Sequence, residues 1–177
     1  MKKIIYSPGE PSGIGPDLII KLSSSNLWED LKIPIVSIGD PKLFIDRAAL
    51  LKKKIKIIEL ESLNQVSKNC KGLIQIIKVT KCSNTRPGKL YKSNAQYVLD
   101  NLTYSIKQTM QNEVTALVTG PLSKENIISI DKLFTGHTEY IKKITKSKDV
   151  LMMLASDQLR VALATTHIPL KLSLIHI

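Results

Sequence analysis

Cysteine, aromatic residues and long apolar runs are scarce in this chain of 177 residues, and each shortage excludes a class of protein. The two cysteines, Cys70 and Cys82, are too few for a disulfide-stapled secreted scaffold or a four-cysteine zinc module. No apolar run approaches the roughly 20 residues that a bilayer-spanning helix needs, so we expect no membrane association. The basic N-terminus reaches Pro8 and Gly9 before a signal-type apolar region forms, which predicts a cytoplasmic protein.

The charge balance is strongly basic. Lysine and arginine total 26 against 15 aspartate and glutamate residues, which gives a formal net charge of +11. A positive field of this kind suits nucleic acid or small anionic substrates. However, aromatic residues make up only 5% of the chain, and single-strand binders need aromatic stacking platforms beside a basic groove. We therefore expect solvated lysine faces and no nucleic-acid partner.

Short apolar segments alternate with amphipathic segments along the chain. The pattern predicts strands at 4–7, 33–38, 55–60, 73–79 and 114–118. It predicts helices at 16–23, 41–51, 93–111, from about 123, and 137–146. This alternation predicts an α/β fold with a substantially parallel sheet. Two later apolar runs, 150–155 and 159–165, are separated by three residues, which predicts an antiparallel hairpin in a mixed sheet or in a second lobe.

Two glycine-containing loops follow predicted strands, where open α/β sheets bind their ligands. The first, residues 9–16, has the outline of a phosphate cradle, but Leu18 stands where a dinucleotide fingerprint needs its third glycine. A ligand loop and a tight strand-to-helix turn therefore both stay open for this segment. The second loop, residues 119–124, ends at Lys124, which could meet an anion.

Histidine occurs only three times, so its positions are informative. His137 and Thr138 lie at a predicted helix start, where imidazole and hydroxyl could face a ligand together; alternatively, Thr138 caps the helix and His137 is a surface residue. His167 follows an apolar run, a position that suits a metal ligand, an acid–base group or a structural histidine. His176, near the end of the chain, carries little weight.

Several of these segments keep a common order and spacing over about residues 4 to 171. They are residues 8–16, 39–41, 118–121 with Lys124, 134–139, 152–155 and 159–170. Together they resemble the 4-hydroxythreonine-4-phosphate dehydrogenase family of pyridoxal phosphate (vitamin B6) biosynthesis. The resemblance implies an isocitrate/isopropylmalate-dehydrogenase-like fold, a homodimer in which each chain forms two α/β lobes around a cleft.

Chains of that family are near twice this length, so the resemblance covers the N-terminal half only. It implies that residues 1–125 form the first lobe, which is incomplete without the missing half. Residues 126–171 would begin the second lobe. Residues 172–177 end on apolar side chains and are expected to be a non-native tail.

The resemblance also implies an activity and some of its residues. The enzyme would use NAD or NADP and a divalent metal (zinc, or magnesium, cobalt or manganese) to oxidise 4-phosphooxy-L-threonine to 2-amino-3-oxo-4-phosphooxybutanoate. That product then decarboxylates to 3-amino-2-oxopropyl phosphate. His137 and Thr138 match the substrate-binding pair, and His167 matches one of three metal-binding histidines. The other two lie in the absent half, so we expect an inactive fragment.

The sequence identifies neither the acid–base group nor the cofactor-binding residues. Two other functions stay open. One is a related dehydrogenase that acts on a four-carbon sugar-acid phosphate or an aromatic dihydrodiol. The other, which ranks last, is a non-catalytic basic binding domain.

Overall fold

The computed structural model describes residues 2–111 and 113–163. The chain divides into two compact units, Met1–Phe134 and Thr135–Ile177. His167 and the 172–177 tail lie outside the described residues.

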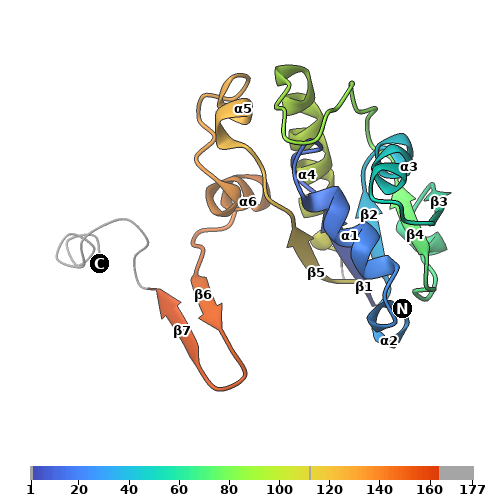
Figure 1. The fold of residues 1–177 in the computed structure, drawn as a ribbon. Coiled ribbons are helices and arrows are strands. Elements are labelled where there is room, and N and C mark those ends of the chain that lie inside the picture. The colour runs from blue at the N-terminus through green and yellow to red at the C-terminus, as the bar shows by residue number, and fades with distance from the viewer. Residues whose placement is uncertain (1, 112, 164–177) are drawn as a thin grey trace, which may run out of the picture. The chain divides into compact units, whose positions relative to one another are not determined.

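The first unit is built on a five-stranded sheet (Figure 1). Its strands are β1 (Lys3–Ser7), β2 (Ile35–Ile38), β3 (Lys56–Leu60), β4 (Leu73–Ile77) and β5 (Val114–Thr119). Its helices are α1 (Gly15–Ser23), α2 (Leu27–Asp30), α3 (Pro41–Leu50), α4 (Ala95–Thr109) and α5 (Lys124–Ile128), with the short 3-10 helices η1 (Leu63–Gln65) and η2 (Lys92–Asn94).

All pairings in this sheet are parallel, in the order β3-β4-β2-β1-β5. The chain moves outward from β1 through β2 to the β3 edge and later crosses from β4 back over β1 to β5. Because such crossovers are right-handed, α1 and α3 cover one face of the sheet and α4 covers the other (Figure 1). The predicted α/β fold with a parallel sheet is confirmed.

The core has a part on each face of the sheet, and one cluster lies on the face that α4 covers. This cluster joins Ile5, Val36, Ile38 and Val114 to residues after β3 and in β4. The predicted apolar stripe of α4 is buried at each of its positions, which are Ala95, Val98, Leu99, Leu102 and Ile106. A stripe with this spacing places its side chains on one helix face, which here packs on β1 and β5.

The structure departs from the predicted elements mainly at short segments. The strand expected from residue 33 begins at Ile35, after Pro34, which has no N–H to donate to a neighbouring strand. Helix α2 was not predicted, because four residues are too few to show a helical period. It buries Trp28, whose indole Nε1 donates to the Leu73 carbonyl over 3.2 Å.

The second unit contains α6 (His137–Thr145), β6 (Met152–Ala155) and β7 (Arg160–Leu163). The two strands pair antiparallel, with Met152 opposite Leu163 and Ala155 opposite Arg160. The predicted hairpin is confirmed, and it forms a two-stranded sheet of its own. Among the described residues, no helix is both long enough and apolar enough to cross a bilayer.

The α4 stripe yields a stability prediction. Leu102 is 2% exposed, so Leu102→Ala leaves a cavity and should lower the free energy of unfolding by about 2–5 kcal/mol in urea denaturation. The same substitution at Leu50, which is 65% exposed on α3, is the matched control and should change stability little. Equal effects of the two substitutions would contradict the packing described here.

Candidate functional site

Loops that follow four of the parallel strands meet at the carboxyl edge of the sheet. Hydrogen bonds between backbone groups connect them: Gly120 N donates to Ser7 O over 2.7 Å, Gly39 N to Ile77 O over 3.1 Å, and Gly88 N to Ser12 O over 2.9 Å. Ligands of open α/β sheets bind at this edge. A ligand of the Met1–Phe134 unit is therefore expected at this edge.

The loops after β1 and β5 pack backbone against backbone. Gly9 has φ +78°, and a Cβ atom on it would lie 2.3 Å from the Pro121 carbonyl oxygen. A Cβ atom on Gly120 would lie 2.2 Å from the Pro8 carbonyl oxygen. Glycine is therefore required at both positions, and the N–H of Glu10 donates to Pro121 O over 3.0 Å at the same contact.

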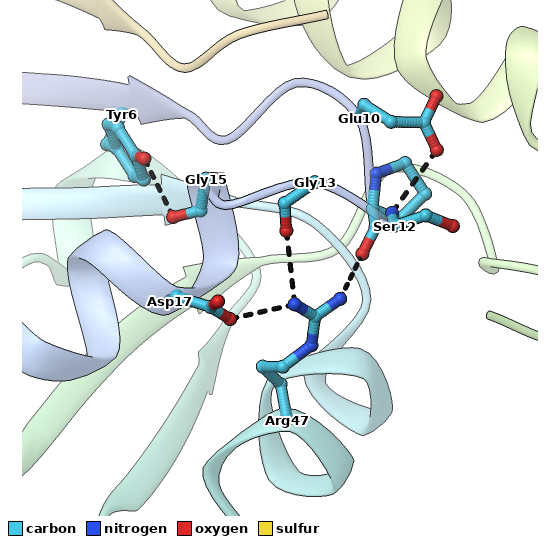
Figure 2. A network of polar contacts seen from close by, with 8 residues as sticks. Tyr6, Glu10, Ser12, Gly13, Gly15, Asp17 and Arg47 are labelled. Carbon is cyan, nitrogen blue, oxygen red and sulfur yellow. Dashed lines mark hydrogen bonds and ion pairs between the residues drawn. The ribbon is translucent and has the colours of Figure 1, made fainter. Parts of the chain in front are cut away.

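The guanidinium of Arg47 holds the β1–α1 loop in place (Figure 2). Arg47 comes from α3 and is 4% exposed. Its Nη1 donates to Gly13 O over 3.1 Å and to the Asp17 carboxylate over 2.8 Å, and its Nη2 donates to Pro11 O over 2.7 Å. One cation thus supplies donors to two loop carbonyls and to an acidic residue in the first turn of α1.

The amide groups of the same loop are largely used within the protein. Ser12 N donates to the carboxylate of Glu10 over 3.2 Å, and Gly13 N donates to the carbonyl oxygen of Glu10 over 3.0 Å. An anion cradle needs such N–H groups to face a ligand. Of the two interpretations of residues 9–16, the tight strand-to-helix turn therefore fits the geometry better. The buried Ser12 hydroxyl has no hydrogen-bond partner among the described residues.

Glu10 is a buried carboxylate that connects the β1–α1 loop with α5. It is 4% exposed, and its Oε2 accepts a hydrogen bond from Asn126 Nδ2 over 3.2 Å. Asn126 Nδ2 also donates to Tyr91 O over 3.1 Å, and Asn126 N donates to the hydroxyl of Ser123, the N-cap of α5. The start of α5 is thereby fixed against the glycine-containing loop.

Asp40 organises the loops after β2 and β4. Its carboxylate caps α3 by accepting from Lys42 N over 3.1 Å, and it also accepts from Cys82 N over 2.9 Å. Its own N–H donates to the hydroxyl of Tyr97 over 3.0 Å, and burial raises the pKa of Tyr97 well above its ordinary value. A cavity of about 350 Å³ lies beside Asp40, with Arg47 and Cys82 in its wall.

The thiol of Cys82 is held in its protonated form. Burial, followed by the negative charges of Asp40 and Glu10, raises its pKa to about 12. The Sγ atom lies 3.6 Å from the Asn94 side-chain oxygen, to which it can donate. Cys70, by contrast, is exposed. A nucleophilic role for Cys82 is therefore disfavoured, because the thiolate is the reactive form.

His137 and Thr138 are the first two residues of α6, in the second unit. Both side chains are half-buried, and Gly136 is the N-cap residue, without a side-chain cap. Thr138 lies inside the first turn and is not the N-cap residue, so the prediction that it caps the helix is wrong. The two side chains stand at the positive end of a helix dipole, a setting that favours an anionic ligand.

The described residues contain no complete set of ligands for the predicted metal. His167 lies outside the described residues. Within residues 2–111 and 113–163, no group of three or more His, Cys, Asp or Glu side chains is arranged to hold a metal ion. A catalytic zinc normally takes three protein ligands. The described residues therefore do not form a metal centre by themselves, and we derive no catalytic step from one.

The fold and its loops define an α/β protein with a parallel sheet and a polar loop cluster at the carboxyl edge. The comparison with known proteins is more specific. The family of the pyridoxal phosphate biosynthetic protein PdxA matches residues 30–176, and the chain belongs to this family.

Curated relatives carry the name 4-hydroxythreonine-4-phosphate dehydrogenase. The protein of Citrobacter koseri is 37% identical over 171 residues, which cover 97% of this chain and 51% of the relative. That of Yersinia pseudotuberculosis is 37% identical over 168 residues, 95% of this chain and 50% of the relative. The chain thus spans about half the length of these relatives, as the sequence motifs predicted.

Solved structures of the same family also match this chain. The crystal structure of the 4-hydroxythreonine-4-phosphate dehydrogenase from Klebsiella pneumoniae matches with a TM-score of 0.85 and 26% identity. The match covers 97% of this chain and 53% of that structure. The predicted fold class is confirmed, and the chain spans about half the length of this solved dehydrogenase.

Sequence reasoning missed Arg47 and Asn126 as organisers of the loop cluster. Arg47 lies in a helix outside all the motifs, and an arginine at its spacing is ordinary on a solvated face. Asn126 follows the motif of residues 118–121 with Lys124, and its partner Glu10 is 116 residues away. A buried polar residue on an otherwise apolar helix face is the only signal that could have indicated either one.

The Arg47 contacts yield a second stability prediction. Arg47→Met leaves the Asp17 carboxylate and two carbonyls without their donor, and it should lower the free energy of unfolding by about 3–5 kcal/mol in urea denaturation. The matched control is Lys42→Met, which breaks the exposed Lys42–Asp46 pair of the same helix and should leave stability nearly unchanged. A negligible effect at Arg47 would show that this guanidinium does not hold the loop.

The two thiols yield a prediction on reactivity. At pH 8, iodoacetamide should modify Cys70 quickly in the native protein and Cys82 only very slowly, because the pKa of Cys82 is about 12. Mass spectrometry after timed quenching measures both rates. Cys70→Ser should abolish the fast reaction, Cys82→Ser should preserve it, and both cysteines should react once urea unfolds the chain. Equal native rates would contradict the described burial of Cys82.

Proposed function

We propose that this chain is the N-terminal half of a 4-hydroxythreonine-4-phosphate dehydrogenase. Its membership in the PdxA family, together with the dehydrogenase names of relatives that it matches over nearly its full length, carries the proposal. The complete enzyme would oxidise the secondary alcohol of 4-phosphooxy-L-threonine, with NAD or NADP as hydride acceptor and release of a proton. The resulting β-keto acid then loses carbon dioxide and gives 3-amino-2-oxopropyl phosphate.

The residues of this chain would contribute to substrate binding. His137 and Thr138 are consecutive residues in the first turn of α6, where two polar side chains and the helix dipole favour an anionic phosphorylated substrate. The net charge of +11 adds a field that attracts such a substrate. The proposal also includes a divalent metal, zinc first, with His167 as one ligand and the remaining ligands from outside this chain.

On this proposal the 177-residue chain is inactive alone. The active form would be a homodimer of complete chains. Substrate contacts in α6 cannot replace the cofactor-binding and metal-binding residues that the relatives' other half would supply. Activity should therefore appear only when that half is joined to this one.

A chimera tests the proposal. Residues 1–171 of this chain replace the matching half of the Citrobacter koseri dehydrogenase, and reduction of NAD or NADP is followed by absorbance with 4-phosphooxy-L-threonine and zinc. We expect turnover by the chimera and none by the 177-residue chain. His137→Ala and Thr138→Val should each lower the chimera's kcat/KM by about 10- to 100-fold, as loss of a hydrogen bond to a charged group does.

Lys148→Ala, an exposed substitution in the same unit, is the control and should leave kcat/KM unchanged. Two results would contradict the proposal. One is turnover by the 177-residue chain without the added half. The other is a folded chimera that prefers a four-carbon sugar-acid phosphate or an aromatic dihydrodiol over 4-phosphooxy-L-threonine.

A further inference from the structure

The cavity of about 350 Å³ beside Asp40 lies between α3 and the segment that follows β4. Its wall combines residues from the 40–50 range with residues from the 81–87 range. Cavities that bind small molecules have volumes of about 300–1,000 Å³, so this one can hold a small ligand. All of its lining residues belong to the Met1–Phe134 unit, and neither His137 nor Thr138 contributes to it.

Both carboxylates in the cavity wall are already occupied by partners from the protein. Asp46 accepts a hydrogen bond from Lys42 Nζ over 2.6 Å. Asp40 accepts one N–H on each of its oxygens, from Lys42 over 3.1 Å and from Cys82 over 2.9 Å. In addition, Lys78 Nζ lies 4.0 Å from Asp40 Oδ1. A cationic ligand would have to displace these partners, so the cavity does not favour one.

The donors in the wall, by contrast, are not all used. In the described part of the chain, the Lys81 ammonium has no ion-pair partner. Arg47 is 4% exposed and uses Nη1 and Nη2 for Asp17 and the β1–α1 loop, but its Nε–H reaches no acceptor among the described residues. The backbone N–H groups of Asn84 and Thr85 likewise reach no described acceptor. The unpaired charge at this cavity is therefore positive.

The segment around the cavity strengthens the positive field. Residues 78–92 contain five cations and no acidic residue. The cations are Lys78, Lys81, Arg86, Lys89 and Lys92. A local excess of one sign of charge raises the concentration of small ions of the opposite sign and speeds their association. The cavity is thus placed to receive an anion.

The remaining wall residues define the size and chemistry of that anion. No aromatic side chain lines the cavity. Nucleobases typically stack on aromatic rings, so a nucleotide fits poorly. Leu43 and Leu50 instead offer a short apolar surface. A phosphate monoester carries a charge of about −1.5 to −2 at pH 7 and three acceptor oxygens, which suit several separate donors better than the two oxygens of a carboxylate do.

We propose that this cavity binds a small aliphatic phosphate monoester. The phosphate lies at the Lys81 ammonium and the N–H groups of Asn84 and Thr85. The carbon skeleton lies against Leu43 and Leu50. The site is complete within this chain, so the proposal does not depend on the proposed activity.

A nuclear magnetic resonance titration of the isotope-labelled 177-residue chain with glycerol 3-phosphate tests the proposal. The amides of residues 81–85 should shift saturably, with a Kd of about 1 mM or tighter. Lys81→Ala should raise Kd about tenfold, because a hydrogen bond to a charged group is lost, and Lys81→Glu should raise it further. Lys81 is exposed, so both substitutions should leave Tm unchanged.

Lys53→Ala and Lys53→Glu are the matched controls. Each changes the net charge by as much as the corresponding Lys81 substitution, and Lys53 is exposed and does not line the cavity. Both should bind glycerol 3-phosphate like the unchanged chain. Lactate, inorganic phosphate and adenosine monophosphate are the comparison ligands, and each should bind more weakly than glycerol 3-phosphate.

Several results would overturn the proposal. One is the absence of saturable shifts in residues 81–85. Another is equal weakening by the Lys53 and Lys81 variants, which would show only a general effect of net charge. Tighter binding of lactate or adenosine monophosphate would assign another class of ligand, and equal binding of inorganic phosphate would show that the cavity does not recognise the carbon skeleton.

The chimera described above gives a second test that does not depend on the stability of the 177-residue chain. Glycerol 3-phosphate should raise the Tm of the chimera, and Lys81→Glu should reduce this increase whereas Lys53→Glu should not. An equal increase in both variants would overturn the proposal, whether or not the chimera is active.

Discussion

The loop cluster depends on the hydrogen bonds that the buried guanidinium of Arg47 donates. A loop that closes over the edge of a sheet buries its carbonyl groups, and buried carbonyls need donors. Arg47 supplies donors to Pro11 and Gly13 and neutralises Asp17 at the start of α1. Because one planar group makes all these contacts, the positions of α1, α3 and the β1–α1 loop are fixed together.

The fixed loop in turn determines what the carboxyl edge of the sheet looks like. With Pro11 and Gly13 held by Arg47, Glu10 points toward Asn126, and Gly9 contacts the β5 loop at Pro121. The negative charges of Glu10 and Asp40 then lie close enough to Cys82 to raise the pKa of its thiol. The edge is therefore a connected polar network of internal partners and not a set of independent turns.

The first unit forms a sheet with a core and leaves one side of β5 open. The face of the sheet that packs on α4 is filled by residues from β1, β2, β4 and β5. The other face is closed by α1 and α3 only as far as β1. Strand β5, which carries no charge on its edge, therefore ends the sheet without the protection that Lys56 and Glu59 give to β3.

The sequence by itself determined the order of strands and helices, the α/β class, the hairpin at residues 152–163 and the family. These follow from periods of two or 3.6 residues and from motifs, which are local properties of the chain. The α4 stripe is an example, since each of its apolar positions is buried. Short elements such as α2 were not predicted, because four residues cannot show a helical period.

Only the tertiary structure decided which polar residues meet and which surface stays open. Glu10 and Asn126 are 116 residues apart, and Arg47 and Asp17 are 30 apart, so no local pattern connects them. The same holds for the apolar groove between α1 and β5, because Leu18 and Val118 become neighbours only after β5 has crossed to the far side of β1. Local periodicity specifies which residues face inward, whereas the topology of the sheet specifies which residues they face.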